Sequence, residues 1–179
     1  MKKAQPKWII ASICVLAVFV VGILASLGVF TSEEGAIQKA KEASEQAFHN
    51  EPAEANKQLE NVSLFLPSSM TIESQEANNL ILQDGNQQYL LFYNPLEKPT
   101  SDVYFQTAKE AENLLTITEF ENDDRYGYMS IVKIGDKRYE LQVGIGGAKM
   151  TTESSKQSLA SNAQDMMNIV SSVTHPEEE

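Results

Sequence analysis

An apolar stretch near the N-terminus constrains this chain more than any other feature. Residues 8–30, WIIASICVLAVFVVGILASLGVF, form a run of 23 residues without a charged side chain. As a helix rising about 1.5 Å per residue, this run is roughly 34 Å long, which exceeds the ~30 Å hydrocarbon layer of a bilayer. The sequence therefore predicts an uncleaved transmembrane helix over residues 8–30, in contact with membrane lipid.

Two other interpretations of this stretch stay open. A cleaved signal peptide carries an apolar segment of only about 7 to 15 residues before a small-residue cleavage site, which here would lie at residues 25–28. A lipoprotein needs a small residue before the lipidated cysteine, whereas Ile13 precedes Cys14. The length of the stretch and the identity of Ile13 favour the anchor over both.

The charges that flank the span predict its orientation. Three lysines lie within residues 1–7, whereas the first charged residue after the span is Glu33. Because cytoplasmic flanks carry the excess of Lys and Arg, residues 1–7 are expected to be a cytoplasmic tail and the chain from Thr31 onward to be extracytoplasmic, on the outside of the cell membrane. Within the span, Gly22 and Ser26 form a small-xxx-small pair, a pattern that favours association with another transmembrane helix.

The predicted extracytoplasmic part is strongly acidic. It holds 11 Lys and Arg residues against 25 Asp and Glu residues, a formal charge of −14. This charge argues against nucleic acid as a partner. The commonest role of such a negative charge is to keep a protein soluble, and the alternative is that it recognises cations or basic partners. The only cysteine, Cys14, lies in the predicted span, so the sequence excludes disulfides, zinc–thiolate sites and thiol catalysis in the outer part.

Residues 31–60 are predicted to form a helical stalk. Thr31 and Glu34 match a capping box, and small or apolar residues then recur at helical spacing, which predicts a helix over residues 33–48. Pro52 is placed to begin a second short helix that ends near residue 60. The alanine-rich stripe of the first helix favours close packing, either against a partner's helix or against the chain's own domain.

Residues 61–174 are predicted to form one α+β extracytoplasmic domain. The clearest element is a hairpin in which strands at residues 80–82 and 89–93 flank an Asp-Gly-Asn turn. The second strand, YLLFY, is apolar on both faces, so we expect it inside a sheet that is covered on both sides. Further strands are expected at residues 62–66, from residue 72, and at residues 115–121, 126–134 and 138–145.

Two helices complete the predicted domain. One is expected from residue 101 or 102 to residue 113, and the other carries a strict apolar seam at Leu159, Ala163, Met166, Val170 and Val173. The predicted fold is therefore an antiparallel sheet of about 5 to 6 strands covered by helices, followed by an acidic tail over residues 175–179.

The order of these elements resembles that of a known family. The run LFLPSSMTIESQEANNLILQDGNQQYLLFYNP, followed by a helix, a meander and a closing helix, is similar in layout to PsbP-like domains over residues 62–173. The whole chain also resembles single-pass membrane proteins of Bacillus-type bacteria, in which a short Lys-rich tail and one span precede such a domain. This resemblance implies binding or assembly without catalysis, and it supplies no site residues.

The stretch VGIGGAKMTT, residues 143–152, is the one candidate phosphate loop. A P-loop needs Lys and a hydroxyl residue directly after its last glycine, whereas here Ala148 follows Gly147. The stretch also lacks the third glycine of a dinucleotide-binding fingerprint. We therefore expect no nucleotide, and we expect the glycines to turn the last strand into the final helix. An anion or partner contact made by Gly146, Gly147 and Lys149 at the start of that helix is the alternative.

No other constellation in the sequence predicts chemistry. The two histidines, His49 and His175, lie at the end of a predicted helix and in the tail, which is unsuitable for a catalytic triad. Glu121, Asp123 and Asp124 lack the spacing of an EF-hand loop. We accordingly predict no catalytic residue, no metal and no cofactor, and expect the protein not to be an enzyme.

Three functions remain to be compared. The leading hypothesis is a membrane-anchored, non-enzymatic binding or assembly module that acts on another membrane or envelope protein. The alternative is a ligand- or cation-sensing ectodomain that reports to a membrane partner, for which we expect a buried cavity. A hydrolase of wall material is the third, and it requires a cleft with converging carboxylates.

Overall fold

The computed structural model describes residues 32–174. The predicted cytoplasmic tail, the predicted span with Gly22 and Ser26, and the acidic tail with His175 lie outside the described residues. Within residues 32–174, none of the helices combines the length and the apolar character that crossing a bilayer requires.

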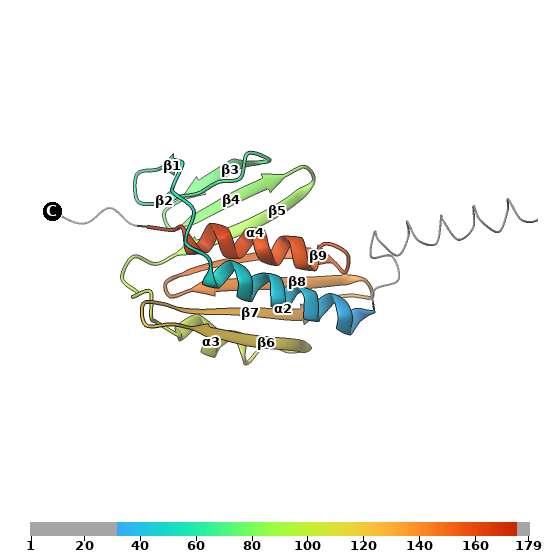
Figure 1. The fold of residues 1–179 in the computed structure, drawn as a ribbon. Coiled ribbons are helices and arrows are strands. Elements are labelled where there is room, and N and C mark those ends of the chain that lie inside the picture. Colours follow the sequence, from blue (N-terminus) through green and yellow to red (C-terminus); the bar gives the residue numbers. More distant parts are fainter. Residues whose placement is uncertain (1–31, 175–179) are drawn as a thin grey trace, which may run out of the picture.

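The described chain forms an α+β fold around one large antiparallel sheet (Figure 1). Helices α2 (Glu33–His49) and α4 (Leu159–Ser171) lie side by side across one face of this sheet, and the short helix α3 (Val103–Ala108) packs on the other face. The seven strands run in the order β3-β4-β5-β9-β8-β7-β6. Their bounds are β3 (Met70–Glu76), β4 (Asn79–Asp84), β5 (Gln87–Tyr93), β6 (Leu114–Glu121), β7 (Tyr126–Lys133), β8 (Arg138–Ile145) and β9 (Ala148–Ser155).

The sheet has more strands than predicted because β9 lies where we expected a turn into the final helix. Gly146, at φ +51°, helps to close a two-residue turn, so that Ile145 pairs with Ala148 and the chain returns as a strand. Side chains in β9 alternate between buried and less buried, as a strand with one covered face requires. The prediction of a direct turn into the helix is wrong: β9 joins β5 to β8, and α4 begins only at Leu159.

The predicted hairpin of β4 and β5 is confirmed, but the expected cover on both faces of β5 is not. Asp84 pairs with Gln87 across the turn, and β5 lies inside the sheet between β4 and β9. Leu91 is fully buried beneath the helices, whereas Leu90 on the opposite face is 46% exposed. The helix that we expected as cover ends at Ala108 and packs farther across the sheet, against Tyr128.

The first predicted helix is confirmed as α2, and it belongs to the domain rather than to a free stalk. Its cap is Ser32, one residue later than predicted, and the Ser32 hydroxyl accepts a hydrogen bond from the Gly35 amide at 3.0 Å. The small side chains Ala36, Ala40, Ser44 and Ala47 form a buried stripe. This stripe lets α2 pack closely against the apolar seam of α4.

The second predicted stalk helix is absent. Residues 51–56 carry no helix, and the short strand β1 (Lys57–Gln58) pairs with β2 (Ser63–Leu64). The Asn56 side chain fixes this segment, because it accepts from the Leu66 amide at 2.8 Å and donates to the Leu66 carbonyl at 3.0 Å. These hydrogen bonds join residues ten positions apart and hold the segment extended beside β2.

Both ends of α2 are fastened to the sheet. At the first turn, a Glu33 carboxylate oxygen accepts hydrogen bonds from Lys133 Nζ at 2.7 Å and from the Tyr139 hydroxyl at 2.6 Å. At the last turn, the Arg125 guanidinium donates to the carbonyls of Phe48 and Asn50 and lies 4.9 Å from the centre of the Phe48 ring. A cation at this end also complements the helix dipole.

Candidate functional site

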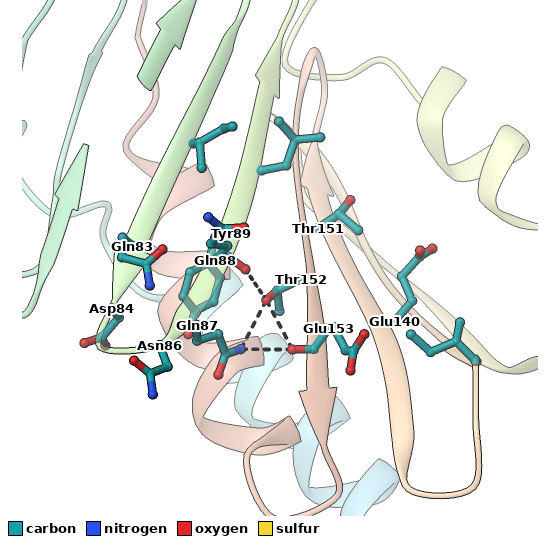
Figure 2. Close-up of a pocket in the computed structure, with 13 residues that line it drawn as sticks. Gln83, Asp84, Asn86, Gln87, Gln88, Tyr89, Glu140, Thr151, Thr152 and Glu153 are labelled. Carbon is teal, nitrogen blue, oxygen red and sulfur yellow. Dashed lines mark hydrogen bonds between the residues drawn. The ribbon is translucent and has the colours of Figure 1, made fainter. Parts of the chain in front are cut away.

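The face of the sheet opposite α2 and α4 is only partly covered. Helix α3 closes one end, where the Phe105 ring lies 5.5 Å from the Tyr126 ring and 6.2 Å from the Tyr128 ring. Beyond α3, strands β4, β5, β9 and β8 expose a shallow hollow of about 1190 Å³ that is open to solvent. We call this surface the open face. It is defined by Ile81, Gln83, Gln88, Leu90, Glu140, Gln142, Thr151 and Glu153, and Figure 2 shows the side chains that line the hollow.

The register of the strands aligns one row of the open face across the sheet. Ile81 pairs with Leu90, Leu90 with Thr151, and Thr151 with Gln142. Directly paired side chains on one face lie close enough to interact. The row therefore combines an aliphatic half on β4 and β5 with a polar half on β9 and β8, a composition suited to contact with a protein surface.

Hydrogen bonds fix the polar half of this row. The Tyr128 hydroxyl donates to Gln142 Oε1 at 2.7 Å, and Gln142 Nε2 donates to the Thr151 hydroxyl at 3.2 Å. Burial raises the pKa of the Tyr128 phenol far above its ordinary value, so the group stays protonated and remains a donor. The Gln142 side chain is therefore held in one orientation.

The end of the open face away from α3 is acidic. Glu140 on β8 pairs directly with Glu153 on β9, and both side chains are exposed. Arg138 Nη1 lies 3.2 Å from a Glu153 oxygen, in an ion pair whose two side chains are 62% and 52% exposed. Neither of the two ion pairs found within residues 32–174 includes Glu140. Directly opposed carboxylates repel each other, so a cation placed between them would be favourable.

A buried polar layer supports the hollow from the helix side of the sheet. Gln87 Nε2 donates to the Thr152 hydroxyl at 3.1 Å, and this hydroxyl donates to the Gln88 carbonyl at 2.6 Å, as Figure 2 shows. Beside it, Asn162 on α4 donates to the Ser154 hydroxyl at 2.9 Å and accepts from Tyr89 at 3.3 Å. These bonds join α4 to β5 and β9 and hold the backbone beneath the open face.

The three candidate contact residues of the glycine-rich stretch do not lie at the start of a helix, which the anion hypothesis required. Gly146 and Gly147 make the turn between β8 and β9, and a Cβ on Gly146 would lie 2.5 Å from the Lys98 carbonyl oxygen. Lys149 lies within β9, with Nζ 5.0 Å from the Tyr104 ring centre and 5.8 Å from the Phe92 ring centre. The helix start that was to supply amide donors is at the other end of β9, so the premise for anion binding is wrong.

The histidine and the acidic turn that the sequence analysis considered make contacts within the fold. His49 ends α2 with its ring 5.1 Å from the Phe48 ring. In the turn between β6 and β7, Asn122 Oδ1 accepts from the amides of Asp124 and Arg125, both at 3.0 Å. No group of three or more His, Cys, Asp or Glu side chains within the described part of the chain is arranged to hold a metal ion.

The open face is the surface that the sequence analysis missed. Its signal was present in β9, where the run AKMTTESS alternates side chains with a period of two, but the neighbouring glycines and Ser residues made a helix start equally plausible. Without β9, the strands that carry Leu90 and Glu140 would not be joined in one sheet. No protein-family model and no curated protein matches the chain.

Proposed function

We propose that this protein is a membrane-anchored, non-enzymatic binding or assembly module that acts on another membrane or envelope protein through the open face. The apolar stretch over residues 8–30 supplies the anchor, and the domain is extracytoplasmic. The open face supplies the contact surface. The single observation that carries the proposal is the exposure of Leu90, 46%, on an inner strand of the sheet.

The composition of the open face supports a protein partner. An antiparallel sheet that only meets water on one side alternates cleanly between apolar and polar positions. Strand β5 departs from that pattern on its outer face: Phe92 already packs against Tyr104 of α3, but Leu90 is exposed there beside Gln88, and Ile81 extends the aliphatic surface onto β4. Covering these side chains would remove apolar area from water, and the surrounding amides would bond to a partner's backbone.

The shape of the hollow favours a protein over a small ligand or a wall substrate. Ligand pockets bury most of the ligand, whereas this hollow is shallow and open to solvent. A hydrolase would need a carboxylic acid kept protonated by burial, and the paired Glu140 and Glu153 are both exposed. The binding module therefore fits the surface better than either alternative.

Chemical crosslinking in intact cells tests the proposed function. The full chain, carrying a C-terminal affinity tag, is crosslinked in its native membrane, and captured proteins are identified by mass spectrometry. We expect reproducible recovery of at least one membrane or envelope protein. Recovery of none, at wild-type expression and with an efficient crosslinker, contradicts the proposal. A reporter fused after Glu179 tests the orientation. If this reporter is active only in the cytoplasm, the predicted extracytoplasmic position of the domain is wrong.

A further inference from the structure

The fastening of α2 determines which end of the domain is nearest to the anchor. Glu33 is bonded to Lys133 and Tyr139 at the end of the sheet where β7 ends and β8 begins. Only two residues separate Phe30 from Glu33 in the sequence. An extended chain covers about 3.3 to 3.6 Å per residue, so the Glu33 backbone, whose side chain is bonded to this end of the sheet, lies within about 11 Å of the last apolar residue.

The acidic end of the open face lies at this same end of the sheet. Tyr139, which holds Glu33 on the helix side, is followed directly by Glu140 on the open side, and Glu140 pairs with Glu153. The aliphatic and amide row of Leu90 and Gln142 lies two residues farther along the strands, about 7 Å farther from that end. The open face thus presents acidic side chains first and aliphatic side chains second, counted from the anchor.

From this order and from the proposed function, on which the inference rests, we infer the chemistry of the partner. The open face binds an extracytoplasmic segment of an integral membrane protein, with a Lys or Arg side chain close to the membrane and an apolar side chain about 7 Å farther out. The basic side chain lies between Glu140 and Glu153, and the apolar one covers Leu90 and Ile81. Gln88, Gln142 and Thr151 bond to the segment's backbone.

Charge disfavours two other occupants of the open face. A second copy would bring together two extracytoplasmic parts that each carry a formal charge of −14, and would add acidic groups near Glu140 and Glu153. Anionic lipid headgroups would meet the same carboxylates and be repelled. A basic protein segment is attracted by both the local pair and the net charge.

Site-specific photocrosslinking of the full chain in its native membrane tests the inference. A benzophenone amino acid replaces Gln88 on the open face or, as the control, Glu45 on the exposed side of α2. We expect an adduct only from position 88, and we expect the crosslinked peptide to carry Lys or Arg and to adjoin a transmembrane segment of its own protein.

A charge reversal supplies the second readout. Glu140→Lys should lower the adduct yield from position 88 at least about fivefold, because like charges across an interface oppose binding. Glu110→Lys makes the same change at an exposed position outside the open face and should leave the yield unchanged. Equal amounts of both variants in the membrane, with equal resistance of the domain to trypsin, confirm that both are folded.

Each remaining outcome overturns the inference. An adduct with a soluble wall protein, with lipid or with a second copy identifies a different occupant, and a yield insensitive to Glu140→Lys removes the role of charge. An adduct from position 45 alone moves the contact to α2, which overturns the open face as the contact surface and leaves standing only the binding of a membrane or envelope protein. If neither position gives an adduct while chemical crosslinking still captures a membrane protein, only the assignment to the open face fails.

Discussion

The two faces of the central sheet differ in what covers them, although the same strands build both. On the helix side, Leu91 and Met150 are fully buried beneath α2 and α4 and belong to the main core. On the other side, their neighbours Leu90 and Thr151 meet solvent, and only the short α3 packs nearby. The comparison separates a covered face that stabilises the fold from a partly exposed face, to which we assign the proposed contact.

The largest expected effect comes from the pair of adjacent leucines in β5. Leu91→Ala should lower the free energy of unfolding by about 2 to 5 kcal/mol, because it leaves a cavity in the core. Leu90→Ala, the matched control on the open face, should cost less than about 1 kcal/mol, because that side chain already meets solvent. Urea unfolding of the full chain in detergent, followed by circular dichroism, measures both. Equal losses would contradict the division into two faces.

The second expected effect compares two glycines that share a left-handed conformation. Gly146 and Gly85 have φ of +51° and +55°, but a Cβ would meet backbone atoms at 2.5 Å only at Gly146, and nothing within 4 Å at Gly85. Gly85→Ala should therefore cost about 1 kcal/mol of strain alone. Gly146→Ala should cost at least about 1 kcal/mol more, since the loop that contains Lys98 and Pro99 must move. Thermal unfolding of the two variants shows whether close packing at this turn matters.

The third effect concerns the fastening of α2 to the helix side. Arg125→Ala leaves the carbonyls of Phe48 and Asn50 without their cationic donor and should lower stability by about 1 to 2 kcal/mol. Arg138→Ala breaks the exposed pair with Glu153 and should cost at most about 0.5 kcal/mol. Chemical unfolding distinguishes the two, and a larger loss from Arg138 would mean that the open face also carries stability.

The smallest expected effect is a dependence on pH. Hydrogen bonds from Lys133 and Tyr139 lower the pKa of Glu33 from its ordinary value of 4.5. A lowered pKa in the folded state contributes stability that is present above pH 4.5 and is lost as the pH falls through the folded pKa. Glu33→Gln should therefore flatten the fall in stability below pH 4.5 and be only mildly destabilising at neutral pH. Melting temperatures at closely spaced acidic pH values, with Glu34→Gln as the control, test this sign.

Local patterns in the sequence were sufficient to predict most elements. The seam of α4 and the turn between β4 and β5 are encoded by near neighbours, through helical spacing in one case and a turn glycine in the other. The strand expected at residues 62–66 is present as the two-residue β2, but its partner β1 was missed because that pairing depends on tertiary hydrogen bonds such as those of Asn56. Helix α3 ends at Ala108, five residues before the predicted end at residue 113. Asn113 itself has a positive φ of 57°, which is not a right-handed helical conformation.

The open face was not predictable without knowing the strand order. Leu90 and Glu140 are separated by fifty residues of sequence and share a surface only because β9 lies between β5 and β8. The alternation in β9 was visible, but Ser and Thr side chains fit both a strand and a helix start. Long-range pairing therefore decided the surface on which the proposed function depends.

The central claim, that the open face binds a membrane or envelope partner, is tested most directly by comparing two exposed leucines. Leu90 lies on the open face, and Leu96, which is 90% exposed, lies in the loop after β5. The measurement is the amount of partner captured by chemical crosslinking in intact cells from wild-type, Leu90→Lys and Leu96→Lys chains, normalised to the amount of each chain in the membrane. We expect Leu90→Lys to lower capture at least about tenfold and Leu96→Lys to leave it unchanged. Equal capture by all three chains would contradict the account.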